Sequence, residues 1–161
     1  MTFYRFLLTL AAALVAIAAT AQTDITVGGL NADPDAPIEV SADALSVDQD
    51  TGRAVFEGNV VIGQGALRIA AARVLVVYND ESGDISQLEA SGGVTFVTET
   101  EAAEAQSAVY DLDTGQLVLT GSVLLTQGAT AISADRMDVN LESGRAQMAG
   151  NVKTVFQQGG N

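Results

Sequence analysis

Four short acidic segments, each ending in glycine, are the first candidates for chemistry in this 161-residue chain. They read "DQDTG" (48–52), "NDESG" (79–83), "DLDTG" (111–115) and "NLESG" (140–144). Carboxylates that alternate before a glycine could bind calcium, but an EF-hand loop needs glycine at its sixth position and glutamate at its twelfth. Counted from Asp48, Gly52 stands fifth and Asn59 twelfth. We therefore predict hairpin turns, closed by Asp or Asn side chains with glycine at positive φ, and no metal site.

Catalytic chemistry has few residues to draw on. The chain contains no Cys, His or Trp, which excludes Cys–His nucleophile pairs, histidine-based serine triads and zinc sites of the Cys/His type. The pairs Asp48/Asp50 and Glu99/Glu101 could serve a carboxylate-based hydrolase, but such a pair needs one raised pKa in a cleft. A turn and a solvated face explain these two pairs better. We predict no catalytic residue, no cofactor and no enzyme.

The N-terminus has the pattern of a signal peptide. Arg5 precedes a thirteen-residue apolar run at 6–18, and Ala19-Thr20-Ala21 fits a small-x-small cleavage site. We expect residues 1–21 to be cleaved and 22–35 to be a flexible segment; the alternative is an uncleaved membrane anchor. Removal of Arg5 leaves six Lys and Arg residues against 20 Asp and Glu residues, a net charge of −14. This charge disfavours contact with phosphates, so no nucleic-acid binding is predicted.

A glycine-led strand recurs four times along the rest of the chain. Gly58, Gly92, Gly121 and Gly150 each stand two residues before a valine, with spacings of 34, 29 and 29 residues. Such a period indicates stacked supersecondary units. Around these marks apolar residues alternate with period two, for example at Leu75 and Val77. The pattern predicts an all-β fold of four repeats of about 30 residues, with roughly 14–16 strands of ordinary length. It also predicts a bulge or corner at each glycine.

Residues 100–108 ("TEAAEAQSA") have a helical composition. We nevertheless expect strand or loop there, because the corresponding segments of the other repeats are strands. The resulting β-domain spans 36–156 and is followed by a short polar tail at 157–161.

The segment "APIEVSADALSVDQDTGRAVFEGNVVIGQGALRIAAARVLVVY" (36–78) resembles the start of the OstA-like domain of the LptA family. "LTGSVLLTQG" (119–128) and "ISADRMDVNLESGRAQMAGNV" (132–152) repeat the pattern. The resemblance implies a twisted, open-ended antiparallel β-jellyroll in the periplasm whose apolar interior receives the acyl chains of lipid A. It also implies head-to-tail self-association, an LptC-like inner-membrane partner and the N-terminal domain of an LptD-like outer-membrane partner, and thus transport of lipopolysaccharide between the membranes.

Alternation and resemblance together select candidate residues. The predicted lipid-binding, inward apolar residues are Ile38, Val40, Phe56, Val60, Ile62, Leu67, Ile69, Val94, Phe96, Leu117, Leu119, Val123 and Leu125. The predicted edge strands for assembly comprise Ile38, Glu39 and Val40 at one end and Val152, Lys153, Thr154, Val155 and Phe156 at the other.

Two other interpretations remain open at this level. In the first, the same inward residues form a dry core in a structural β-solenoid or filament-forming periplasmic protein. In the second, the chain is an LptC-like domain that keeps its N-terminal anchor.

Overall fold

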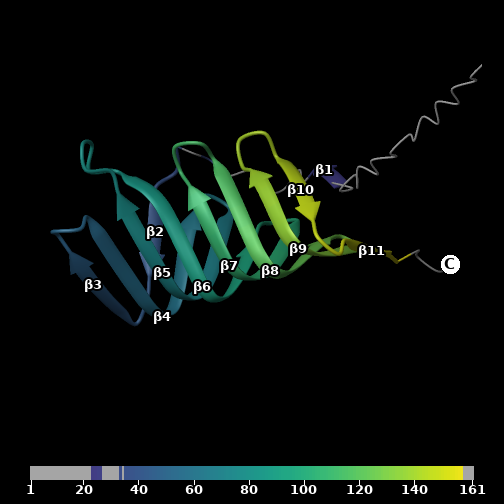
Figure 1. Ribbon diagram of the computed structural model, residues 1–161, viewed down its shortest axis with the longest axis horizontal. Helices are drawn as coiled ribbons and strands as arrows, with labels where there is room; N and C mark the ends of the chain where they lie inside the picture. Colours follow the sequence, from purple (N-terminus) through teal and green to yellow (C-terminus); the bar gives the residue numbers. More distant parts are fainter. Residues whose placement is uncertain (1–22, 27–32, 34, 158–161) are drawn as a thin grey trace, which may run out of the picture.

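The computed structural model describes residues 23–26, 33 and 35–157, and these residues form an all-β structure without helix (Figure 1). The strands are β1 (Thr23–Thr26), β2 (Ile38–Ser41), β3 (Ala44–Asp48), β4 (Arg53–Gln64), β5 (Leu67–Tyr78), β6 (Ile85–Val97), β7 (Glu101–Asp111), β8 (Gln116–Gln127), β9 (Thr130–Asn140), β10 (Arg145–Ala149) and β11 (Lys153–Phe156). The predicted fold class is therefore confirmed, and β7 settles residues 101–108 as strand.

The number and length of the strands differ from the prediction. The described part of the chain has 11 strands rather than 14–16, and β4 to β9 are 11–13 residues long. The reason is that three of the four repeated glycines do not end a strand. Gly58, Gly92 and Gly121 lie inside the long strands β4, β6 and β8, which bend there, whereas Gly150 separates β10 from β11.

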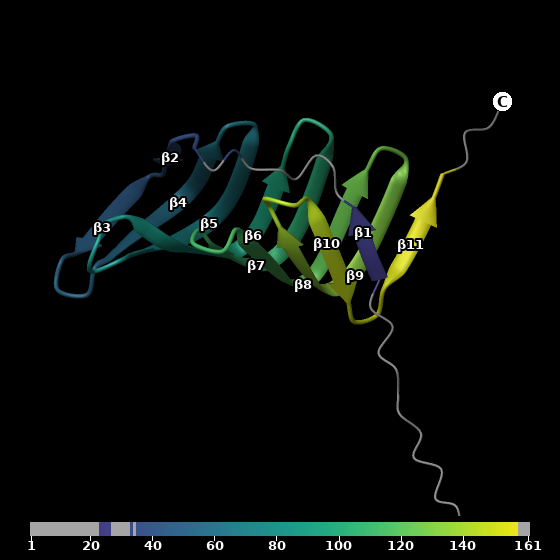
Figure 2. The same cartoon turned by 90° about the horizontal axis from the view of Figure 1, so that it is seen from above.

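The strands form one antiparallel sheet that follows the chain order from β4 to β10. Its order is β1-β10-β9-β8-β7-β6-β5-β4-β2, with β3 also paired to β4 and β11 also paired to β9 (Figure 2). The strand β1 lies within the segment 22–35 that was expected to be flexible. At 23–26 that expectation is corrected, because these residues pair with β10.

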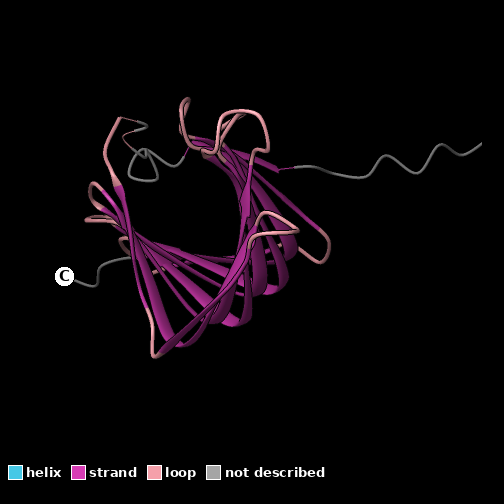
Figure 3. Ribbon diagram, turned by 90° about the vertical axis from the view of Figure 1, so that its left-hand side faces the viewer, coloured by secondary structure: helices cyan, strands magenta, loops and turns pink. Residues whose placement is uncertain are grey.

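Bulges fold the sheet along a line through its middle. The register shifts between Glu57 and Val60 in β4, between Ser91 and Val94 in β6, and between Thr120 and Val123 in β8. At each shift two residues of one strand stand opposite one residue of the next, which bends and twists the strand. Viewed along its length, the sheet is a trough with two walls (Figure 3).

The glycines of these bulges are required by close packing. A Cβ on Gly58 would lie 2.5 Å from Oδ2 of Asp43, and one on Gly92 would lie 2.6 Å from Cβ of Ala72. Gly121 faces Gln106 and Gly150 faces Asp135 in the same way. The predicted corner at each glycine is thus present, and a neighbouring side chain fills the space that a Cβ would need.

The acidic segments are turns, as predicted. Oδ1 of Asp48 accepts hydrogen bonds from the backbone N–H groups of Asp50 (3.0 Å) and Thr51 (3.3 Å). Hydrogen bonding by Thr51 is the main cause that lowers the pKa of Asp48. Asn79, Asp111 and Asn140 close the other three turns in the same way. Within 23–26, 33 and 35–157, no group of three or more His, Cys, Asp or Glu residues could hold a metal ion.

The predicted signal peptide, residues 1–21, lies outside the described residues, as does the tail after 157. Among the described residues no helix has the length and hydropathy needed to cross a membrane.

Candidate functional site

The inner face of the folded sheet is a continuous apolar interior. Ten of the predicted inward residues are at most 4% exposed: Val60, Ile62, Leu67, Ile69, Val94, Phe96, Leu117, Leu119, Val123 and Leu125. The other three, Ile38, Val40 and Phe56, are half-buried and pack against this core. Strand alternation therefore selected residues that point inward, although burial alone does not distinguish a lipid-binding surface from a dry core.

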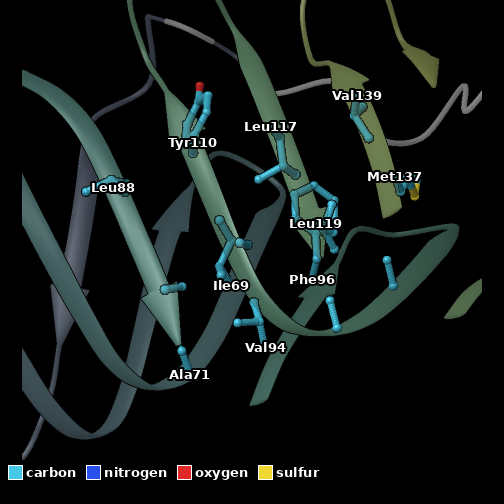
Figure 4. Close-up of a cluster of buried hydrophobic side chains, with 14 of the residues drawn as sticks. Ile69, Ala71, Leu88, Val94, Phe96, Tyr110, Leu117, Leu119, Met137 and Val139 are labelled. Atoms are coloured by element: carbon cyan, nitrogen blue, oxygen red, sulfur yellow. The ribbon is translucent and has the colours of Figure 1, made fainter. Parts of the chain in front are cut away.

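Several interior residues were not selected from the sequence. They include Val74, Val76, Leu88, Tyr110, Met137, Val139, Leu141 and Met148, together with eight alanines such as Ala71, Ala103 and Ala134. Figure 4 shows that Leu88, Tyr110, Leu117 and Val139, from four different strands, belong to the same cluster as Ile69 and Phe96. The apolar interior thus continues from β4 to β10.

In the second half of β5 the buried residues are Val74 and Val76, neither of which was among the predicted inward residues. Leu75 and Val77, which alternate in the sequence, are only half-buried. The strand crosses the fold line at Ala72, opposite the bulge of Gly92, and its inward phase shifts there by one residue. The shift is imposed by the neighbouring strand, because two residues of β6, Gly92 and Gly93, stand opposite Ala72 alone.

The two margins of the trough differ in chemistry. One margin carries the turns 65–66, 98–100 and 128–129; its inner-face residues are Gln64, Thr98, Glu101, Gln127 and Thr130, and we call them the polar rim. The other margin carries the turns 79–84, 112–115 and 141–144; its inner-face residues are Tyr78, Leu112 and Leu141, and we call them the apolar rim.

A hydrogen bond joins the two margins. The hydroxyl of Tyr110, next to the apolar rim, donates to Oε1 of Gln64 in the polar rim over 3.5 Å, and Nε2 of Gln64 donates to the carbonyl of Ala36 over 3.4 Å. Burial, and to a smaller extent the charge of Glu142, raises the pKa of Tyr110, which keeps its hydroxyl in the donating form. In this structure the margins therefore meet at Tyr110, and the interior is closed there.

Glu101 corrects the interpretation of the acidic pair Glu99/Glu101. Glu99 is exposed, but Glu101 is 4% exposed and lies on the inner face. Its Oε1 accepts a hydrogen bond from Nε2 of Gln127. The two carboxylates thus occupy different environments, one exposed in the turn 98–100 and the other buried. Asp48 and Asp50 both lie in an exposed turn, so neither pair forms the cleft-bound acid pair of a hydrolase.

The two ends of the sheet present unpaired strand edges among the described residues. At one end β2 and β3 pair only with β4; at the other, β11 pairs only with β9 while β1 covers β10. The predicted edge residues Ile38 to Val40 lie in β2 and Lys153 to Phe156 lie in β11, with Val152 immediately before it. Large apolar side chains are more than half exposed at both ends: Leu45, Val47, Val155 and Phe156.

Comparison with known proteins decides the family. Residues 39–158 match the sequence family described as "LptA/(LptD N-terminal domain) LPS transport protein". The chain belongs to this family. The resemblance to the LptA family that the residues carry is therefore confirmed. Because the family is one of transport proteins, membership also supports the prediction that the chain is not an enzyme.

Two relatives match the chain over most of its length. An uncharacterised protein of Rhizobium meliloti is 30% identical over 148 residues, which cover 86% of this chain and 80% of that protein. The lipopolysaccharide export system protein LptA of Haemophilus influenzae is 30% identical over 132 residues, 78% of this chain and 77% of that protein.

A solved structure from the same family has the same fold. The crystal structure of LptH, described as the LptA homologous periplasmic component of the lipopolysaccharide transport device of Pseudomonas aeruginosa, matches with a TM-score of 0.71. The match covers 79% of this chain and 99% of LptH at 16% identity. At this identity the likeness shows the fold, which is the open, folded sheet described above.

Proposed function

We propose that this protein is a periplasmic lipopolysaccharide-binding bridge, which shields lipid A acyl chains in its apolar interior and passes lipopolysaccharide from the inner-membrane export complex to the outer-membrane translocon. The observation that carries the proposal is the continuous apolar inner face from β4 to β10. Family membership also supports a role in lipopolysaccharide transport, since the relatives include lipopolysaccharide export proteins.

The energetics of an acyl chain in water explain why such an interior is needed. Burying a CH₂ group contributes about 0.8 kcal/mol, so a chain of about a dozen carbons loses roughly 10 kcal/mol when it leaves a membrane for water. A long apolar surface without specific contacts can replace that environment. The net charge of −13 for the whole chain argues that an anionic, phosphorylated head group stays outside, in solvent.

Lipid entry requires the interior to open. Core residues such as Leu125 and Met137 are fully buried, so their side chains already fill the space between the two walls. An acyl chain must displace this packing, and the hydrogen bond between Tyr110 and Gln64 must break where the chain enters. The exchange is feasible because the chain offers apolar surface in place of the side-chain contacts that it disrupts.

The strand edges support end-to-end assembly. An exposed edge recruits another strand by β-augmentation, and a contact between two different ends of one molecule propagates without closing. We therefore propose head-to-tail self-association through β2 and β3 of one copy and β11 of another. At the two ends of such an assembly, the free strand edges would pair with an LptC-like inner-membrane partner and with the N-terminal domain of an LptD-like outer-membrane partner. The apolar interiors would then be continuous between the two membranes.

Co-purification tests the lipid function. Expressed in a Gram-negative host with residues 1–161 encoded, the protein should be recovered from the periplasm without residues 1–21 and with lipopolysaccharide bound, as measured by mass spectrometry of the intact complex. Filaments of the mature protein that contain no lipopolysaccharide would instead establish a dry-core structural protein, and retention of residues 1–21 would favour an anchored, LptC-like domain.

Thr154 provides a test of assembly that spares the fold. The backbone N–H of Gln157 donates to Ala129, so by strand alternation the N–H groups of Val155 and Lys153 also face β9, whereas that of Thr154 faces the free edge. Thr154→Pro should therefore leave β11 paired and remove an outward donor. We expect self-association to weaken by at least about tenfold, measured by analytical ultracentrifugation.

The matched control is Thr154→Val, which removes the same hydroxyl but keeps the N–H. It should associate like the wild type. Equal association constants for the proline and valine variants, at unchanged thermal stability, would exclude β11 as an assembly edge.

A further inference from the structure

Glu101 is fixed in place on the inner face of the polar rim. Its backbone N–H donates to Oγ1 of Thr98 over 3.2 Å, and its carbonyl accepts from the backbone N–H of Thr98 over 2.9 Å. Its side chain lies on the same face of β7 as buried Ala103 and Ala105. The carboxylate therefore stands where the apolar interior ends and the margin of the trough begins.

One oxygen of this carboxylate is unsatisfied. Oε1 accepts a hydrogen bond from Gln127, but Oε2 is buried and has no hydrogen-bond partner among the described residues. A buried acceptor without a partner is costly, and it is rare in native structures unless the group has a role. Oε2 is thus free to accept a hydrogen bond from a bound ligand.

A metal ion does not fit this position. Calcium takes six or more oxygen ligands, usually with several carboxylates, and the part of the chain that the structure describes has no group of three or more His, Cys, Asp or Glu residues that could hold a metal ion. A neutral donor needs only one acceptor. An amphiphile whose chains lie in the interior has its polar linkage at the rim, so a hydroxyl or amide N–H near that linkage reaches the level of Glu101.

We propose that Glu101, held by Gln127, is a recognition site for a neutral hydrogen-bond donor, a hydroxyl or amide N–H, near the polar end of a bound acyl chain. This inference rests on the proposed lipid-binding function and adds a preference to it. The interior takes any apolar chain, whereas Glu101 favours a chain that carries a donor where the apolar surface ends.

Three uncharged probes of equal chain length test the preference: methyl dodecanoate, methyl β-hydroxydodecanoate and N-methyldodecanamide. Binding to the mature protein is measured by displacement of a fluorescent fatty-acid analogue. The hydroxyl and amide probes should bind about tenfold more tightly than the plain ester, because a hydrogen bond to a buried carboxylate is among the stronger ones.

Glu101→Met removes the acceptor and keeps an apolar side chain of similar length. It should bind all three probes with the same affinity as the wild type binds the plain ester. Glu101→Gln keeps a neutral acceptor and should show an intermediate preference. This variant provides the test if Glu101→Met does not fold. Glu104→Met, on the exposed face of the same strand, is the matched control and should keep the full preference.

The outcomes separate this inference from the proposed function. If the wild type binds all three probes equally, or if the preference survives in Glu101→Met or is undiminished in Glu101→Gln, the inference is wrong and the lipid-binding function stands. A preference that appears only with added calcium would also contradict it. If no probe binds, the lipid-binding interior itself is refuted, and the preference with it.

Discussion

Gly92→Ala should lower the free energy of unfolding by about 2–5 kcal/mol, a large part of the stability of a domain of this size. Two costs add together. The backbone at Gly92 has φ +82°, where a non-glycine residue is strained by about 1–3 kcal/mol. The new Cβ would also lie 2.6 Å from Cβ of Ala72 on β5, so β5 and β6 would have to separate at the fold line.

Gly93 is a control at the next position. Its φ is +86°, but a Cβ there would meet no atom within 4 Å. Gly93→Ala should therefore cost only the backbone strain, about 1–3 kcal/mol. Urea denaturation of both variants under the same conditions measures the difference. If the two variants were equally stable, close packing against Ala72 would not be what holds the fold line together.

The fold line matters for the interior as well. It brings the two walls of the sheet face to face (Figure 3). Residues from both halves of a long strand therefore share one core, such as Leu88 and Phe96 of β6 (Figure 4). Without the bend, the same alternation would give a flat sheet with one exposed apolar face. The repeated glycine is thus a structural element of the interior and not a ligand-binding motif.

Alternation in the sequence predicted interior residues on β4, β6 and β8 and at the start of β5, with Leu67 and Ile69, but it missed those that follow the fold line in β5, β7 and β9. In β4, β6 and β8 the inward phase is unbroken, as in Val94 and Phe96 after Leu88 and Ala90. In β5, β7 and β9 one residue is skipped at the fold line, so Ala71 is followed by Val74 and Ala134 by Met137. A local pattern cannot show this shift, because it is imposed by the bulge of a neighbouring strand.

Contacts between residues far apart in the chain could not be predicted either, because they depend on how the sheet folds. Tyr110 and Gln64 are 46 residues apart and meet only because the sheet folds. Glu101 looked like part of a solvated acidic face, and only the register of β7 places it inside. The strand β1 also escaped prediction, because its partner β10 lies at the far end of the sheet.

The central claim is that the inward face of the sheet holds acyl chains, and two adjacent leucines of β8 test it most directly. Leu125 is 0% exposed and points inward, whereas Leu124 is 37% exposed and points outward. A photoreactive amino acid is placed at each position in turn, and cells that make lipopolysaccharide are irradiated. Both variants must first show the wild-type thermal transition, since replacement at Leu125 disturbs the core.

The expected result is a lipopolysaccharide adduct at position 125 with at least about a tenfold lower yield at position 124, because a lipid in the interior can contact only the inward side chain. Adducts at position 124 alone, or none at position 125 in a folded protein that still assembles, would contradict the account.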